Sequence, residues 1–246
     1  MAQMLAKSLP LVFLALLSAN GVYGAVFNLR NECSFTVWPG TLTGSGAAIS
    51  DSGLALSPGA SDQIQAPPTW SGRVWARTGC NFDAGGAGSC TTGDCPGGLK
   101  CTAGGQPPVT LAEFTLGASP AANDFYDVSL VDGYNVGVGI KTTGSGTGDC
   151  SYAGCVEDLN ARCPPELQVT ADGAVVACKS ACAAFNTAEY CCTGEHATPG
   201  TCGPTKYSQL FKSACPTAYS YAYDDASSTR TCAGSDYLIT FCPTGS

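Results

Sequence analysis

Alternating apolar and polar residues mark three β-strands along this chain. The alternation covers residues 33–38, 110–116 and 237–241, and each segment has apolar side chains at every second position. Gly, Pro and Ser residues separate such segments. A period of two with these separators predicts an antiparallel β-sandwich or barrel rather than βαβ units.

Helical spacing replaces this alternation in the later part of the chain. Short apolar sets with a helical spacing occur at 156–163 and 178–185, and the clearest amphipathic run is 207–214. Thr205 is the expected N-cap of that run, and Pro216 is expected to stop it.

These patterns predict a β core with two cysteine-rich insertions. The Gly- and Cys-rich insertion has almost no apolar periodicity, which indicates a small lobe of loops held by local disulfides. The expected division is a leader at 1–24, a β core from 25–77, 109–156 and 216–246, a disulfide loop lobe at 78–108 and a disulfide-rich helical lobe at 157–215.

The N-terminal segment predicts secretion. Lys7 precedes an apolar stretch from Leu9 to Leu17, and small residues lead up to Gly24. This is the pattern of a signal peptide, with cleavage expected after Gly24. A membrane anchor is the alternative, but the apolar run is shorter than the ~20 residues that a membrane span needs.

All sixteen cysteines follow the expected leader. An even count behind a secretory signal predicts up to eight disulfides, although spacing alone leaves the pairing open. Zinc is the alternative. The cysteines at 90, 95, 101, 178 and 182 do not form paired C-x-x-C motifs, and His196 is the single histidine. We therefore expect no metal and no cofactor.

The acidic balance restricts the partners. Loss of Lys7 with the leader changes the net charge from −8 to −9 at pH 7. Nucleic acid and anionic lipid would be repelled by this charge, whereas an uncharged glycan would not. The chain has no N-x-S/T sequon. We expect a monomer without a membrane anchor.

Several motifs resemble those of thaumatin-like proteins, and together they cover essentially the whole mature chain. One is Gly86-Ala87-Gly88-Ser89-Cys90-Thr91-Thr92-Gly93-Asp94-Cys95, followed by Gly97-Gly98-Leu99-Lys100-Cys101. The others lie at 73–82, 110–114, 124–133, 202–205, 220–225 and 241–243. The resemblance implies a mainly β fold, a flattened antiparallel β-sandwich with a disulfide-rich helical lobe and a small disulfide-bonded loop lobe.

The resemblance also implies how the cysteines pair. Taken in family order, the pairs are Cys33–Cys242, Cys80–Cys90, Cys95–Cys101, Cys150–Cys232, Cys155–Cys215, Cys163–Cys178, Cys182–Cys191 and Cys192–Cys202.

A cleft between the sandwich and the helical lobe is the implied binding site. Its residues, carried over one by one, are Arg73, Glu113, Asp127, Asp132 and Asp224, with the adjacent Asp225 as the other candidate for the last position. Glycoside hydrolysis needs one protonated carboxyl and one ionised carboxylate. Glu113 is the natural candidate for the acid and Asp132 for its partner, while Arg73 would orient both.

The sequence also places a condition on this cleft. Asp127 and Asp132 have opposite parity, so an uninterrupted strand would point them to opposite faces. A bulge or a strand end near Gly133 has to bring them together. The structural alternative is that these acids only bond to loops and anchor Arg73.

The resemblance implies a secreted, pathogenesis-related plant defence protein of the apoplast. We expect an antifungal protein that binds β-1,3-glucan or another fungal cell-wall polysaccharide. A weak endo-β-1,3-glucanase that uses the same carboxylates is the first alternative. A non-catalytic inhibitor of foreign enzymes is the second. A sweet-tasting ligand is disfavoured, because sweet thaumatin is strongly basic and this chain is acidic. Whether the cleft cleaves glucan or only binds it stays open.

Overall fold

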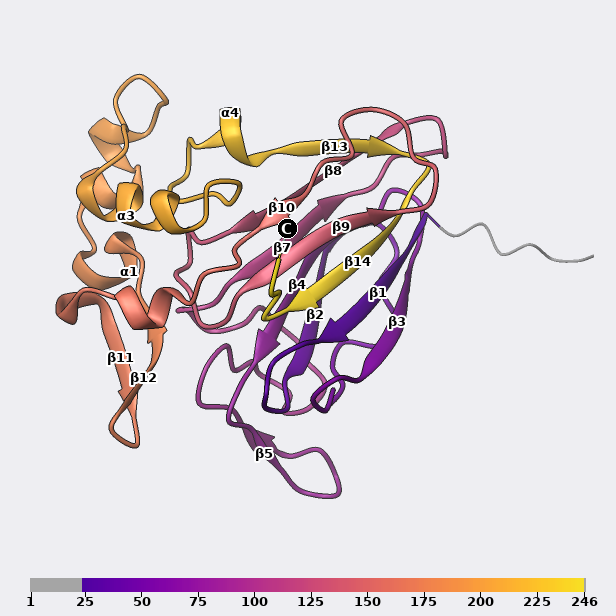
Figure 1. The fold of residues 1–246 in the computed structure, drawn as a ribbon, viewed down its shortest axis with the longest axis horizontal. Coiled ribbons are helices and arrows are strands. Elements are labelled where there is room, and N and C mark those ends of the chain that lie inside the picture. The colour runs from indigo at the N-terminus through magenta and orange to yellow at the C-terminus, as the bar shows by residue number, and fades with distance from the viewer. Residues whose placement is uncertain (1–23, 246) are drawn as a thin grey trace, which may run out of the picture.

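The computed structural model describes residues 24–245, and its main feature is a pair of five-stranded sheets (Figure 1). The first sheet has the order β10-β9-β14-β1-β3 and the second the order β13-β8-β7-β4-β2. Neighbouring strands are antiparallel except for the parallel pair β1–β14. The fold is therefore mainly β, as expected. The expected leader lies outside the described residues, apart from Gly24.

The strands of the two sheets are short and come from all parts of the chain. The first sheet contains β1 (Ala25–Asn31), β3 (Ser61–Ala66), β9 (Val138–Thr143), β10 (Ala153–Gly154) and β14 (Asp236–Phe241). The second contains β2 (Trp38–Ser45), β4 (Ser71–Arg77), β7 (Leu111–Thr115), β8 (Asn123–Ser129) and β13 (Arg230–Ala233). The strands expected near 110–116 and 237–241 are confirmed as β7 and β14.

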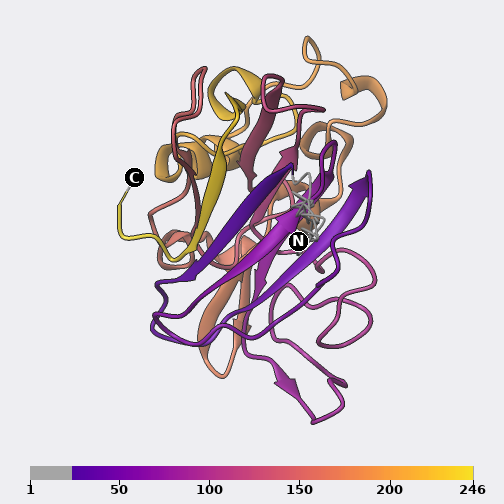
Figure 2. The ribbon, with the colours of Figure 1, turned by 90° about the vertical axis from the view of Figure 1, so that its right-hand side faces the viewer.

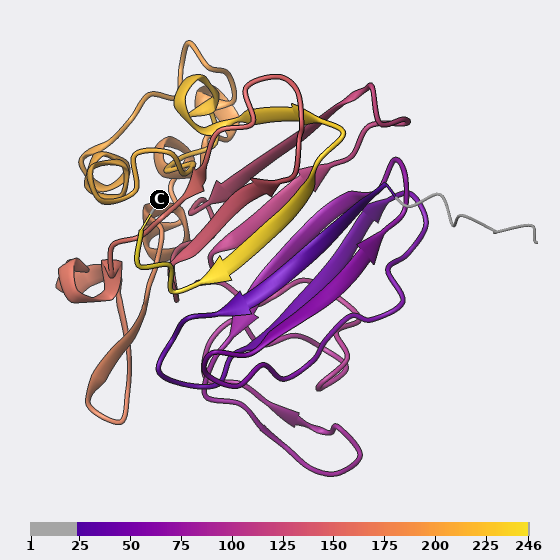
Figure 3. The same cartoon turned by 45° about the vertical axis from the view of Figure 1, so that its right-hand side comes forward.

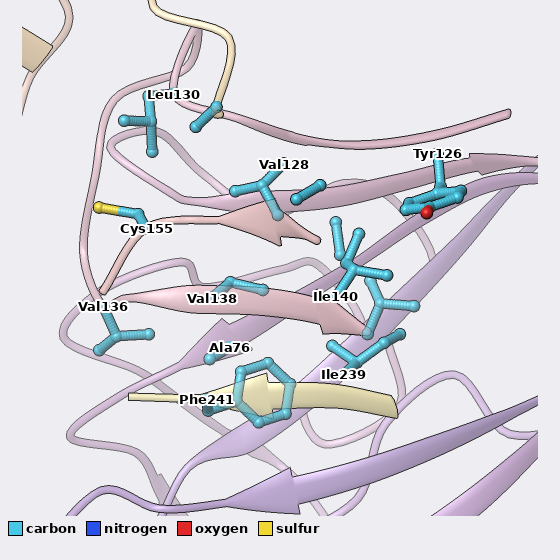
Figure 4. Packing of buried hydrophobic residues seen from close by; sticks show 14 of the residues in the cluster. Ala76, Tyr126, Val128, Leu130, Val136, Val138, Ile140, Cys155, Ile239 and Phe241 are labelled. Atoms are coloured by element: carbon cyan, nitrogen blue, oxygen red, sulfur yellow. The ribbon is translucent and has the colours of Figure 1, made fainter. Parts of the chain in front are cut away.

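Aromatic side chains from both sheets meet in the core of the sandwich. The ring of Phe27 on β1 lies 4.4 Å from that of Phe114 on β7, centroid to centroid. The ring of Tyr237 on β14 lies 5.1 Å from Phe114 and 5.2 Å from Tyr126 on β8. Figure 4 shows how side chains of β8, β9 and β14 point into this layer. Burial of such large rings is a main source of stability for the sandwich.

Two smaller parts extend from the sandwich. One contains the short strands β5 (Asn81–Phe82) and β6 (Gly88–Ser89) and projects beyond the strands in Figures 1 and 2. The other, on the left in Figure 3, contains the remaining elements. These are η1 (Leu159–Arg162), η2 (Pro165–Leu167), β11 (Gln168–Ala171), β12 (Ala174–Cys178), α1 (Ala181–Phe185), α2 (Ala188–Cys191), η3 (Gly194–His196), α3 (Lys206–Ala214) and α4 (Asp225–Ser228).

The described residues contain eight disulfides, and no described cysteine is free. They are the eight pairs that the family resemblance implied: Cys33–Cys242, Cys80–Cys90, Cys95–Cys101, Cys150–Cys232, Cys155–Cys215, Cys163–Cys178, Cys182–Cys191 and Cys192–Cys202. The part with β5 and β6 has few buried apolar residues, and the Cys80–Cys90 and Cys95–Cys101 bridges compensate for this.

The expected strand at 33–38 is wrong. β1 ends at Asn31 and β2 begins at Trp38, so most of the alternating segment is a loop. The Asn31 side chain holds this loop: its Oδ1 accepts from the Cys33 amide, and its Nδ2 donates to the carbonyl of Phe35. The alternation there does not bury one face, since Phe35 is 45% exposed.

The helical expectations are confirmed only in part. The run at 207–214 forms α3, and the Thr205 side chain caps it by accepting from the Ser208 amide. By contrast, Cys178 ends strand β12 rather than joining a helix. The turn between β11 and β12 has Asp172 and Gly173 at φ of 50° and 80°, which fits the Asp-Gly type I′ hairpin.

Candidate functional site

Three charged residues form a row across the second sheet. Arg73 on β4 is the register partner of Glu113 on β7, and Glu113 is the register partner of Asp127 on β8. Opposed side chains on one face of an antiparallel pair have Cβ atoms about 4.5–5.5 Å apart, so these groups interact. Three segments distant in the sequence thus place one base and two acids side by side.

The row lies on the outer face of this sheet. Val74, Ala112 and Val128, the next residues on the same strands, are fully buried in the core. Because successive strand side chains point to opposite faces, the charged row points away from that core. Glu113 and Asp127 are only partly buried.

The loop lobe covers part of this outer face but leaves the row open. Trp75, two residues after Arg73, is fully buried against the Cys95–Cys101 disulfide. Arg77 is also fully buried, and its guanidinium donates to the carbonyls of Gly98 and Leu99 at 2.8 Å each. The outer face is therefore closed at the Trp75–Arg77 end of β4 and accessible at Arg73.

The end of strand β8 brings Asp132 to the same cleft. β8 ends at Ser129, and a turn follows in which the Gly133 amide donates to the Leu130 carbonyl at 2.9 Å. Gly133 has a φ of 93°, a conformation that favours glycine. Asp127 and Asp132 both line one open cavity of about 410 Å³. The opposite parity of these two acids is thus resolved by the strand end.

The two candidate acids at 224 and 225 have different surroundings. Asp225 lines the cavity, and its Oδ1 accepts from the Tyr219 hydroxyl at 2.9 Å. Asp224 is absent from the lining. Its Oδ2 accepts from the Lys212 ammonium at 2.9 Å and from the Ser220 amide at 3.0 Å. The geometry therefore favours Asp225 over Asp224 as the cleft residue, because internal bonds hold the Asp224 carboxylate.

Burial and the neighbouring charges shift the pKa values of the row. Burial raises the pKa of Asp127 to about 8, and the nearby Glu113 and Asp225 act in the same direction. Burial also raises the pKa of Glu113, while Arg73 lowers it and Asp132 raises it. The buried Oδ1 of Asp127 has no hydrogen-bond partner in the described part of the chain, which suits a neutral carboxyl group. At neutral pH the row therefore holds at least one proton.

The cleft extends from the row in two directions. On one side, a hollow of about 310 Å³ shares Arg73, Glu113 and Asp127 and also includes Phe125. On the other side, a narrower pocket of about 150 Å³ shares Asp132 and enters the helical lobe. Tyrosines at 190, 207 and 221 line that pocket. The shared residues make one elongated cleft with an acidic centre and aromatic ends.

Phe125 was missed by the sequence analysis, although a signal for it exists. Its side chain is 49% exposed on β8. Tyr126 and Val128 point into the core, so Phe125 and Asp127 share the opposite face by strand parity. An aromatic residue at this parity, two positions before a cleft acid, was readable from the sequence.

Within residues 24–245, no group of three or more His, Cys, Asp or Glu side chains could hold a metal ion. No helix in the same range is both long and apolar enough to cross a membrane.

Comparison with known proteins identifies the family. The model of the thaumatin family matches residues 31–243. The chain belongs to the thaumatin family. It is 64% identical over 220 residues to "Pathogenesis-related thaumatin-like protein 3.5" from Cryptomeria japonica, covering 89% of this chain and 90% of that one. The expectation from the sequence motifs is thereby confirmed, and this member is a pathogenesis-related, thaumatin-like protein.

Two further similar proteins have names that refer to the hydrolysis of β-1,3-glucan. A protein from Prunus avium named "Glucan endo-1,3-beta-glucosidase" is 51% identical over 235 residues, covering 94% of this chain and 95% of the relative. A β-1,3-glucanase domain from Clostridium beijerinckii matches with a TM-score of 0.51 at 11% identity, covering 88% of this chain and 97% of that domain. At that identity, the second similarity concerns the fold alone.

Proposed function

We propose that this protein is a secreted, antifungal plant defence protein that binds β-1,3-glucan in the acidic cleft. The observation that carries the proposal is the row of Arg73, Glu113 and Asp127 at the centre of an open, elongated cleft. Carboxylates accept hydrogen bonds from sugar hydroxyls, and the arginine donates hydrogen bonds to the sugar oxygens. An extended polysaccharide has room along the connected hollows.

Charge and aromatic side chains favour a neutral sugar polymer. Glu113, Asp127, Asp132 and Asp225 line the central cavity, and Arg73 is its single base within the described residues. An anionic ligand would meet this excess of acids, whereas a neutral glucan would not. At one end, the exposed ring of Phe125 offers an apolar face to sugar C–H groups.

Weak endo-β-1,3-glucanase activity is the second candidate. The raised pKa values of Glu113 and Asp127 favour it, because glycoside hydrolysis needs a protonated carboxyl at neutral pH. The name of the Prunus avium relative points the same way. In this scheme Glu113 donates a proton to the leaving oxygen, and the Asp132 carboxylate acts as nucleophile or activates water.

Glu113→Gln tests both candidates. Under the binding function, the amide weakens retention on insoluble β-1,3-glucan by about 1–3 kcal/mol through the loss of a charged hydrogen bond. Under the hydrolase function, release of reducing sugar stops, since an amide cannot donate the proton, while retention largely persists. The measurements are pull-down and reducing-sugar release for both proteins.

Glu195→Gln is the matched control, because Glu195 is exposed and lies away from the cleft. It should behave as the wild type in both measurements. Retention unchanged in Glu113→Gln, together with no sugar release by the wild type, would contradict both functions of this residue.

A further inference from the structure

A second groove lies where the sandwich, the β11–β12 hairpin and the loop lobe meet. We call it the junction groove. It has a volume of about 810 Å³ and shares no lining residue with the acidic cleft. In Figure 1 the β11–β12 hairpin and the segment with β5 extend on the same side of the sandwich. Its lining includes Phe35, Trp38, Val156, Asn160 and Asp172.

Exposed apolar side chains gather in this groove. Phe35 is 45% exposed and Val156 is 44% exposed, and they are two of the four large apolar side chains that the described chain exposes. Single exposed apolar residues are ordinary, but two of them in one concave groove, beside Trp38, indicate a binding surface.

Hydrogen bonds and a disulfide hold the backbone of the loop that carries Phe35. The Asn31 side chain donates to the Phe35 carbonyl at 2.9 Å and to the Leu56 carbonyl at 2.8 Å. Asn31 itself is fully buried, and the adjacent Cys33 is bonded to Cys242. A loop fixed at both its backbone and its disulfide can present an aromatic ring with little loss of entropy on binding.

Trp38 is supported in a similar way. Its ring packs edge-on against Phe82 at 6.5 Å, and the Arg77 guanidinium lies 5.4 Å from the centre of the Phe82 ring. The Arg77 Nε also donates to the Trp38 carbonyl at 2.9 Å. Three aromatic residues line the groove, Phe35, Trp38 and Tyr134, and these contacts hold Trp38 in place before any ligand arrives.

Disulfides brace the walls around these rings. Cys242 is itself a lining residue, Val156 follows the Cys155–Cys215 bond, and Thr91 follows the Cys80–Cys90 bond. The groove is therefore preformed, and a ligand would not have to order it.

The polar lining offers acceptors and no cation. The Nδ2 of Asn160 donates to the Asn135 carbonyl at 2.9 Å, which fixes the orientation of the amide. Its Oδ1 is buried without a hydrogen-bond partner among the described residues. Asp172 adds a carboxylate, and no Lys or Arg lines the groove. An anionic ligand is disfavoured by this lining, whereas a hydroxyl donor can reach the exposed carboxylate of Asp172.

We propose that the junction groove is a second carbohydrate site, which binds a neutral oligosaccharide by stacking sugar rings on Phe35 and Trp38. Sugar C–H faces pack on these two aromatic rings, and sugar hydroxyls donate to the exposed carboxylate of Asp172. With two separate sites, one molecule can hold two segments of a cell-wall polysaccharide, which increases retention through effective concentration. The proposal does not depend on the function of the acidic cleft.

The test is a titration of ¹⁵N-labelled protein with laminaripentaose, cellopentaose and pentaacetylchitopentaose, followed by NMR. We expect at least one of these neutral sugars to shift the amides at 35–38, 156–160 and 171–176. Phe35→Ala should weaken that binding about tenfold. Phe35→Tyr, which keeps the ring, should bind like the wild type.

Two control variants separate the sites. Phe185→Ala removes an aromatic ring of similar exposure outside the groove and should leave the shifts unchanged. Glu113→Gln should change binding in the acidic cleft and not in the groove. Shifts confined to the cleft would overturn the second site and leave the proposed function intact. Shifts confined to the groove would support the second site and contradict glucan binding in the acidic cleft.

Three further outcomes would also overturn the second site. The first is that none of the three sugars shifts the groove amides. The second is that Phe35→Ala binds as tightly as the wild type. The third is that the groove takes a Lys/Leu peptide and none of the sugars, because the partner would then be a protein.

Discussion

Among the acids of the cleft, the carboxyl group of Asp127 has the most strongly raised pKa, and its surroundings explain this shift. It lies in the middle of β8, beside Glu113 of the neighbouring strand, with Asp225 also close enough to act on it. Burial and two like charges all oppose ionisation. Arg73 acts on Glu113, whose pKa it lowers against the effect of burial. Neighbouring carboxyl groups of one row thus have different proton affinities.

Asp127→Asn tests this assignment through the pH dependence of stability. The pKa of Asp127 rises from 3.8 to about 8 on folding, so the folded state keeps a proton that the unfolded state has lost. The proton on Asp127 contributes its full stabilisation below pH 3.8, and this contribution is lost as the pH rises through about 8. The unfolding free energy of the wild type should therefore fall between these values, and the variant should show a flatter profile.

Denaturant unfolding at several pH values provides the measurement. Asp62→Asn is the control, because Asp62 is exposed on β3. Its profile should follow the wild type. Parallel profiles for Asp127→Asn and the wild type would mean that Asp127 is charged in the folded protein.

At the scale of elements, strand register and helix capping decide where the cleft residues lie. The register of β4, β7 and β8 aligns Arg73, Glu113 and Asp127, and a slip by one residue would send each to the core. Helix α3 positions Lys212, which holds Asp224 away from the cavity. The capping box at Thr205 and Ser208 satisfies amides at the start of that helix.

Thr205→Ala should cost about 1 kcal/mol of unfolding free energy, the usual effect of removing a side-chain N-cap. The reason is that the Ser208 amide, 3.4 Å from the Thr205 hydroxyl, loses its acceptor. Thr205→Ser keeps the hydroxyl and should stay close to the wild type. Thermal unfolding of the three proteins measures the difference, and an equal loss in both variants would argue against the cap.

At the scale of the whole molecule, the two ends of the described part of the chain are joined twice. β1 pairs with β14 in parallel, and the Cys33–Cys242 disulfide connects residues 209 positions apart just beyond these strands. Closing so long a loop restricts the unfolded chain strongly in the chain-entropy account of disulfides. The same bond fixes the loop of Phe35, so it links global stability to the junction groove.

The double variant Cys33→Ser/Cys242→Ser should lose about 2–5 kcal/mol of unfolding free energy, the typical cost of a native disulfide. Denaturant unfolding without reductant measures it. Cys192→Ser/Cys202→Ser is the matched control: it opens a loop with a sequence separation of 10 and should cost less on the entropic account. An unchanged midpoint in the first variant would mean that sheet pairing alone holds the ends.

The sequence by itself determined the features that depend on near neighbours. Alternation at 110–116 and 237–241 predicted strands, and apolar spacing with Thr205 predicted helix α3, because burial of one face requires these periods. The family motifs added the fold and the pairs of all sixteen cysteines. The Asp172-Gly173 turn was equally local, and its hairpin signal was overlooked.

Only the tertiary structure decided the features that depend on distant contacts. The segment at 33–37 alternates, yet it is a loop, because Asn31 and the Cys33–Cys242 bond hold it outside any sheet. Asp225 rather than Asp224 lines the cavity, because the Asp224 carboxylate accepts hydrogen bonds from Lys212 and from the Ser220 amide. Neither choice shows in a local pattern, because each one depends on partners that only the folded chain brings close.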